Sequence, residues 1–253
     1  MIVVHGGPGA AGSMAPAARA LAYWSRVIEP FQRVGSRSVA NHVADLHEIV
    51  QSPCANVPPA LVGHSWGAML ALAYAAVHPA AAGPLVLIGC GTFDLAARDR
   101  MRAIVDARMD DALRRRFEHL PEEFPDPQQR WGEIGRLTLP LYSCDLITSD
   151  QEIDAPDAAT DARASHETWQ DMLRLQNQGT YPAAFAAIKT AVLMVHGADD
   201  PHPGRMIRAS LEPYLPQLEY REFERCGHYP WLEKAAHGKF VAVLRDWLAR
   251  PAP

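Results

Sequence analysis

The sequence predicts an α/β fold with an open, mostly parallel sheet and helices on both of its faces. Short apolar, β-branched runs alternate with amphipathic stretches, which is typical of parallel strands joined by helices. The run Leu85-Val86-Leu87-Ile88 has no polar position, as expected for a strand covered on both faces. The rhythm stops between Thr92 and about Ala187, where the chain is charged and helical in pattern. That break predicts an inserted helical cap.

Each element follows from a local pattern. Apolar runs predict strands at residues 2–5, 26–31, 60–64, 85–89, 191–196 and 218–223. Amphipathic runs predict helices at residues 14–23, 39–50, 68–78, 204–211 and 232–248. Within the cap we expect helices at 99–119 and 165–176, with a proline-rich joint at 121–127. We therefore divide the chain into a core of residues 1–91 and 188–253 and a cap of residues 92–187.

The composition argues against several classes of function. The net charge of the 253 residues is -5, so no basic field favours nucleic acid or an anionic membrane. The four cysteines are scattered without a CxxC pair, which indicates neither a zinc site nor a disulfide framework. We expect free thiols in a cytoplasmic protein that uses no metal and no cofactor.

The strongest chemical signal is Gly63-His64-Ser65-Trp66-Gly67, which lies between a predicted strand and a predicted helix. A strand that turns abruptly into a helix holds the serine in a strained conformation with its hydroxyl exposed above the sheet. Glycines at both ends leave room for the neighbouring backbone. The pattern predicts Ser65 as a nucleophile, with the adjacent His64 in a packing or loop-bonding role.

A second signal, His5-Gly6-Gly7-Pro8-Gly9, follows the first predicted strand. The oxyanion of acyl transfer needs two backbone N–H donors. We assign these to Gly7 and to Trp66, the residue after the nucleophile. A phosphate-binding loop is the weaker interpretation, because no Gly-Lys-Ser/Thr follows and Pro8 lacks an N–H.

Acid and base candidates come late in the chain. Asp199 and Asp200 follow one apolar strand, and His228 follows the next. The order serine, acid, histidine fits a triad in which His228 accepts the Ser65 proton and a carboxylate orients the ring. Asp200 and Asp199 both remain candidates for the acid, and the one that does not take this role would be a turn residue. His202 with one aspartate is a poor metal ligand set.

These four motifs together resemble the α/β-hydrolase superfamily, in the branch with an HGGPG loop and a helical cap. The resemblance covers both halves of the core and implies the triad Ser65, Asp200 and His228, because the acid motif G-x-x-D places the acid at Asp200. It implies a serine hydrolase that cleaves an ester or amide of a small molecule through an acyl-serine intermediate. A peptidase similar to prolyl aminopeptidases and a non-catalytic binding protein on the same fold are the alternatives.

Two departures from that branch are visible. The prolyl aminopeptidase motif D-Q-R-G-x-G-x-S is matched only at Gln32 and Arg33. The family also has two strands before the HGGPG strand, whereas only four residues precede His5 here. Without them the segment from Val27 to Phe31 becomes an apolar sheet edge, which invites pairing with another chain. We therefore expect a homodimer or aggregation through that edge, or a natural chain that begins upstream of Met1.

Overall fold

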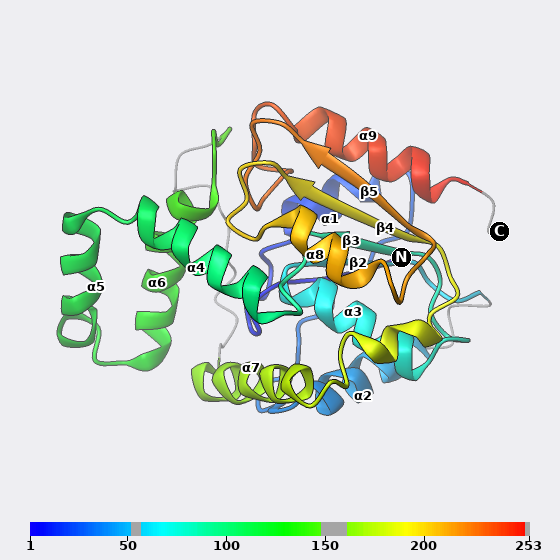
Figure 1. Cartoon of the computed structure of the whole chain (residues 1–253), viewed down its shortest axis with the longest axis horizontal. Coiled ribbons are helices and arrows are strands. Elements are labelled where there is room, and N and C mark those ends of the chain that lie inside the picture. Colours follow the sequence, from blue (N-terminus) through cyan, green and yellow to red (C-terminus); the bar gives the residue numbers. More distant parts are fainter. Residues whose placement is uncertain (52–56, 148–160, 251–253) are drawn as a thin grey trace.

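The structure, a computed structural model, describes residues 1–51, 57–147 and 161–250. Its centre is a sheet of five parallel strands in the order β1-β2-β3-β4-β5 (Figure 1). The strands are β1 (Ile2–Val4), β2 (Leu61–His64), β3 (Leu85–Ile88), β4 (Val192–Gly197) and β5 (Leu218–Phe223). Because all of the strands run the same way, the loops that follow them meet at one edge of the sheet. The predicted fold class is confirmed.

Alternate side chains along the strands pack into two separate hydrophobic layers, one on each face of the sheet. One layer packs against α1 (Ala15–Ala22) and α9 (His237–Leu248), and it includes Val3, Val62 and Val86. The opposite layer packs against the remaining core helices, which lie below the sheet or in front of it in Figure 1. These are α2 (Val39–Val50), α3 (Trp66–Val77), α8 (Gly204–Leu211) and the short 3-10 helix η2 (Ala183–Ala187). Both faces of the sheet are therefore covered, as the apolar strands predict.

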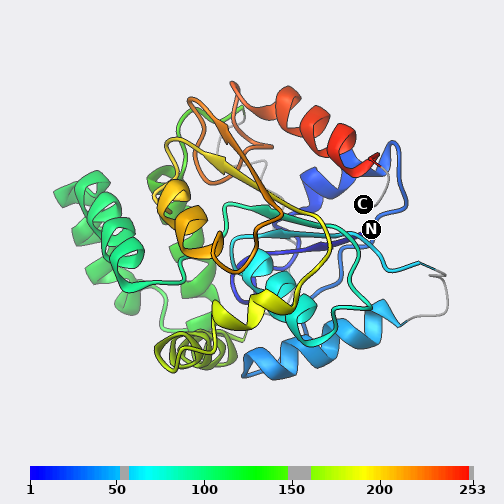
Figure 2. The same cartoon turned by 45° about the vertical axis from the view of Figure 1, so that its right-hand side comes forward.

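Among the described residues, four α-helices precede η2 in the chain between β3 and β4. They are α4 (Leu95–Arg108), α5 (Asp111–Glu123), α6 (Pro127–Tyr142) and α7 (Ala162–Asn177). Figures 1 and 2 show α4, α5 and α6 projecting away from the sheet, whereas α7 lies beside α2. None of the helices in the described ranges combines the length and apolar character needed to cross a bilayer.

The helix predicted at 99–119 is wrong, because two helices occupy this stretch. The Asp110 carboxylate accepts the Leu113 N–H at 2.7 Å and so begins a new helix after Arg108. The proline-rich joint predicted at 121–127 is also wrong, because helices extend into it from both sides. Pro121 lies inside α5, and Pro127 occupies the first turn of α6, where its missing N–H has no cost.

Two further bounds need correction, and both have a physical cause. The strand predicted at 26–31 is a single bridge between Ile28 and Ile2, because Pro30 has no N–H with which to continue the ladder. The helix predicted at 232–248 begins only at His237, since the residues before it bond to another segment, described below.

The outer edge of the sheet lies beside β1. Its exposed apolar side chains are Ile28, Phe31 and Val34, with exposed fractions of 55%, 53% and 64%. Exposed apolar edges invite pairing with another chain. Self-association through the segment from Val27 to Phe31 stays a prediction.

Candidate active site

The residues singled out in the sequence follow successive strands at one edge of the sheet. The His5–Gly9 loop follows β1, Ser65 follows β2, Asp200 follows β4 and His228 follows β5. Parallel pairing brings these strand ends together even though the residues are far apart in sequence. This edge is where open α/β sheets place their ligands.

Ser65 occupies the turn between β2 and α3 in a strained backbone conformation. Its φ is 54° and its ψ is -117°, a region that non-glycine residues enter at a cost of about 1–3 kcal/mol. The Ser65 N–H donates to the Ile88 carbonyl of β3 at 2.8 Å, which holds the turn against the sheet. The Ser65 residue is half-buried, so its side chain remains within reach of solvent.

Gly63 and Gly67 make this turn sterically feasible. A Cβ on Gly67 would lie 2.1 Å from the Val4 carbonyl oxygen, and a Cβ on Gly63 would lie 2.3 Å from the Gly67 oxygen. Side chains at either position would push β1, β2 and α3 apart. The predicted reason for both glycines, close approach of neighbouring backbone, agrees with these distances.

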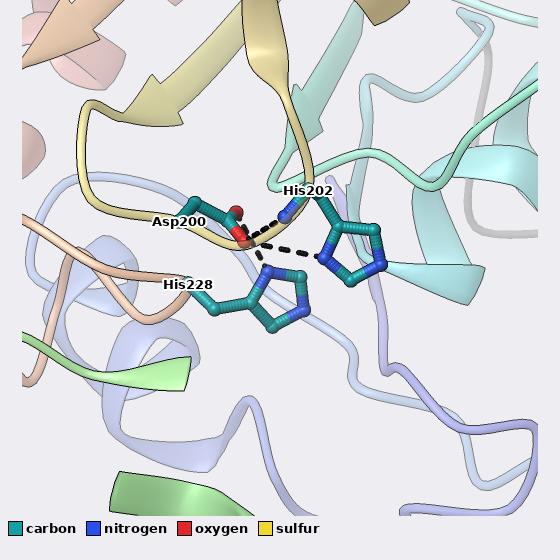
Figure 3. Close-up of side chains that lie close together, drawn as sticks. All are labelled: Asp200, His202 and His228. Carbon is teal, nitrogen blue, oxygen red and sulfur yellow. Dashed lines mark hydrogen bonds and ion pairs between the residues drawn. The ribbon is translucent and has the colours of Figure 1, made fainter. Parts of the chain in front are cut away.

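The acid and base candidates are joined by a short hydrogen bond. His228 Nδ1 lies 2.8 Å from Asp200 Oδ2, and both side chains are almost completely buried (Figure 3). Asp199 instead bonds the Cys144 thiol through its side chain, and its N–H donates to the Cys226 carbonyl at 2.8 Å. The structure therefore pairs His228 with Asp200, the favoured aspartate.

The His228 ring also lies close to the Ser65 turn. A Cβ on Gly89 would be 2.8 Å from His228 Nδ1, and Gly89 directly follows Ile88, the acceptor of the Ser65 N–H. The His64 ring lies 4.5 Å from the His228 ring, and His64 Nε2 is hydrogen-bonded to the His228 carbonyl at 3.0 Å. His64 thus has a loop-bonding role, as the sequence analysis expects.

Asp200 is hydrogen-bonded to two imidazoles, those of His228 and His202, and lies near a third. The His202 N–H donates to Asp200 Oδ1 at 2.9 Å, and His202 Nδ1 lies 3.2 Å from the same oxygen (Figure 3). Behind them, the buried His196 has its Nε2 3.3 Å from Oδ2. The contact of His202 with the acid was not predicted, although a position two residues after an aspartate is a usual place for such a local bond.

Asp200, His202 and His228 lie close enough together to raise the question of a metal ion. The His202 and His228 rings are stacked, with centroids 4.6 Å apart and planes 19° from parallel. An ion must lie near the plane of each ligating imidazole, and two stacked planes share no such point. The arrangement is suited to a hydrogen-bonded acid–base pair rather than to an ion.

Burial and charge set the protonation of this pair. Burial lowers the pKa of His228 below its ordinary value of 6.5, and the Asp200 carboxylate opposes that effect. Burial alone would raise the pKa of Asp200, but the charges and hydrogen bonds of His228 and His202 bring it well below its ordinary range. At neutral pH the pair is a carboxylate beside a neutral imidazole, which can accept a proton.

The His5–Gly9 loop lies against the Ser65 turn. A Cβ on Gly6 would be 3.4 Å from Ser65 Cβ, and Gly7 has a φ of 115°, which favours glycine. Trp66 is the first residue of α3, so its N–H has no acceptor within the helix. Trp66 is therefore next to Ser65 in the chain, and the loop that carries Gly7 contacts Ser65 through Gly6.

The Gln32 side chain links the His5–Gly9 loop to Trp66, the residue after the nucleophile candidate. Its side-chain oxygen accepts the Trp66 indole N–H at 3.0 Å, and its amide NH2 donates to the His5 carbonyl at 3.0 Å. Its backbone N–H donates to His5 Nε2 at 3.2 Å, and burial lowers the pKa of His5 to about 4, so that ring is neutral. In the sequence Gln32 stands out only as a motif match, and this bridging role was not predicted.

Some aromatic side chains lie at the site and others lie in the core. The Tyr142 ring lies 5.5 Å from the His228 ring and 5.7 Å from the His202 ring. Phe185 is fully buried against Tyr181, and Trp231 packs edge-on against His64. Tyr142, at the end of α6, therefore contacts the ring of the proposed base.

Three of the four cysteines are described, and none of these three is in a disulfide. Cys90 and Cys226 are buried and Cys144 is exposed. Cys54 lies outside the described residues.

Comparison with known proteins agrees with this geometry. The sequence profile of the Alpha/beta hydrolase family matches residues 1–243. A 2-hydroxymuconate semialdehyde hydrolase from Pseudomonas sp. (strain CF600) is 24% identical over 196 residues, which are 75% of this chain and 61% of that protein. The chain thus spans about three fifths of the length of this curated relative.

Solved structures show the same fold at low sequence identity. An esterase from Exiguobacterium antarcticum superposes with a TM-score of 0.66 at 18% identity, covering 99% of this chain and 92% of that one. A proline iminopeptidase from Mycobacterium smegmatis superposes with a TM-score of 0.61 at 16% identity, covering 98% and 88%. From the profile match over nearly its whole length, together with the fold, the chain belongs to the alpha/beta hydrolase family.

Proposed function

We propose that the protein hydrolyses an ester or amide of a small molecule through an acyl-serine intermediate on Ser65. The observation that carries the proposal is the buried hydrogen bond between His228 and Asp200 beside the strained Ser65 turn. Such strain persists where the surroundings enforce it, which is common at reactive residues. Membership of a hydrolase family supports the same reaction class.

The reaction would use each group in turn. Ser65 Oγ attacks the carbonyl carbon while His228 Nε2 accepts its proton, and the Gly7 and Trp66 N–H groups stabilise the oxyanion. The oxyanion collapses, the bond to the alcohol or amine breaks, and His228 donates its proton to that leaving group. Water then attacks the acyl-Ser65, with His228 as base, and the acid product is released as Ser65 is protonated. Asp200 holds the ring tautomer and stabilises the imidazolium in both halves.

The test is covalent labelling combined with a substrate panel. A fluorophosphonate probe should label the protein once, and peptide mass spectrometry should place the label on Ser65. Short p-nitrophenyl esters, aryl amides and proline β-naphthylamide would then separate esterase, amidase and aminopeptidase activities. Tight binding of panel compounds without labelling and without turnover would instead favour a non-catalytic binding protein.

The pH dependence follows from the direction of the His228 shift. The base must be neutral to accept the Ser65 proton, and burial lowers its pKa below 6.5. We expect kcat/KM for an ester to rise as the pH is raised through an apparent pKa below 6.5, and to be flat at neutral pH. Initial rates in constant-ionic-strength buffers measure this profile. A rate that does not change between acid and neutral pH would remove His228 from the role of base.

A further inference from the structure

The C-terminal end of α6 is bonded to the loops that carry the acid and the base. The last carbonyls of any helix lack intrahelical partners, and here other groups take their place. The Ser143 hydroxyl donates to the Leu139 carbonyl at 2.8 Å, and the His228 N–H donates to the Tyr142 carbonyl at 2.7 Å. The backbone of the proposed base is thus fixed directly to a helix of the segment between β3 and β4.

The chain after α6 continues along the His228 loop. We call residues 141–147, the last two residues of α6 and the five that follow, the strap. The Ile147 N–H donates to the Leu232 carbonyl at 2.7 Å, and the Lys234 N–H donates to the Asp145 carbonyl at 2.9 Å. Between them, Leu146 and Glu233 form an antiparallel bridge. The strap and residues 227–234 therefore form a short two-stranded ribbon beside the acid–base pair.

Glu233 is the buried anchor of this ribbon. Its side chain is fully buried, and its carboxylate accepts three backbone N–H groups. These are Cys144 at 2.9 Å and Asp145 at 2.6 Å in the strap, and Gly227 at 3.1 Å in the base loop. Gly227 directly precedes His228. A buried carboxylate needs such donors to offset its lost hydration, so the three bonds fix the strap and the base loop relative to each other.

Arg108 makes the matching connection on the acid side. From the end of α4, its two terminal nitrogens donate to the Leu141 carbonyl and to the Asp199 carbonyl, each at 2.6 Å. Asp199 directly precedes Asp200. A guanidinium bonds two acceptors at once because its donors form a rigid fork. The end of α6 thus holds the acid loop through Arg108 and the base loop through Glu233.

We propose that Glu233 and Arg108 are positioning residues that align His228 with Asp200 through the strap, a role that rests on the proposed hydrolase function. Neither side chain touches the reacting atoms. Each bonds the residue immediately before one member of the acid–base pair, and both act on the same short segment. Misplacement of catalytic groups by about 1 Å can lower rates about 100-fold.

Glu233→Gln tests the buried anchor. The amide keeps the shape but turns one oxygen into an NH2 donor that faces backbone N–H groups, so at least one of the three bonds is lost. We expect kcat/KM and the rate of fluorophosphonate labelling to fall together by about 10- to 100-fold, mainly in kcat. The apparent pKa of the profile should also fall, because the contact with Asp200 that raises the His228 pKa is weakened.

The matched control is Glu212→Gln. Glu212 undergoes the same chemical change, but its carboxylate is exposed and pairs with Arg208 one turn earlier, away from the strap. This change should leave the rate and the pH profile unaltered. The other groups facing the His228 ring are His64, His202, Tyr142 and Tyr229, and they are the same in every variant compared.

Arg108→Lys provides a second measurement on an exposed residue that is not needed for the core. One ammonium cannot reproduce the two-armed contact, so a several-fold loss of labelling rate with unchanged helix content is expected. It decides the proposal if Glu233→Gln does not fold. A labelled wild type whose variants keep its rate and pH profile would overturn the positioning role alone. A wild type that is never labelled on Ser65 would overturn the hydrolase function itself.

Discussion

Ser65→Ala is expected to remove ester hydrolysis and fluorophosphonate labelling together. Loss of the nucleophile lowers kcat by about 10⁶-fold in serine hydrolases that use a triad, which is close to the detection limit of most assays. The strained turn should persist, because the Ser65 N–H bond to Ile88 and the packing of Gly67 against β1 involve only backbone. Initial rates with a p-nitrophenyl ester and gel fluorescence of the labelled protein measure the two effects.

Ser210→Ala is the matched control for that change. Ser210 lies on α8 and donates its hydroxyl to the Ile207 carbonyl at 2.7 Å, away from the strand ends that carry the site. Its substitution removes the same hydroxyl group and should leave both readouts unchanged. Full labelling of the Ser65→Ala protein would assign the nucleophile to another residue.

Asp200→Asn is expected to lower kcat by about 10⁴-fold, because the amide no longer fixes the His228 tautomer or stabilises the imidazolium. It also removes the charge that raises the pKa of His228, so the remaining activity should have a lower apparent pKa. Fluorophosphonate labelling should slow in parallel, since it needs the same proton transfer. Rate profiles from acid to neutral pH measure both effects.

Asp199→Asn separates this role from that of the neighbouring aspartate. Asp199 contributes its backbone N–H to Cys226 and its backbone carbonyl to Arg108, and asparagine keeps both. We expect a change of no more than a few-fold in kcat/KM. A large loss in Asp199→Asn with near-normal rates in Asp200→Asn would transfer the acid role to Asp199.

Sequence patterns were sufficient for the five strands that form the sheet and for the turn at Ser65, because both depend on local features. A fully apolar run such as Leu85–Ile88 suits only a strand covered on both faces. The turn at Ser65 needs glycines two residues before and after it, so its pattern is readable along the chain. Helix bounds were harder to predict where one side chain determines them, as the capping side chain of Asp110 does between α4 and α5.

The contacts that support the site could not be predicted from the sequence, because they join residues that are distant along the chain. Gln32 bridges His5 and Trp66 across separate strand ends. Glu233 looks like an ordinary helix position in the linear pattern, yet its carboxylate bonds Cys144 and Asp145, almost 90 residues earlier. Only the parallel order of the strands brings these partners together.

The backbone conformation of Ser65 lowers the stability of the fold at the same position where the proposed reaction needs a serine. Glycine adopts a positive φ without the steric cost that serine bears there. Variant libraries sorted only for heat resistance should therefore enrich glycine at position 65 and lose turnover, whereas libraries sorted for turnover should retain serine. The same residue would be discarded by one selection and kept by the other.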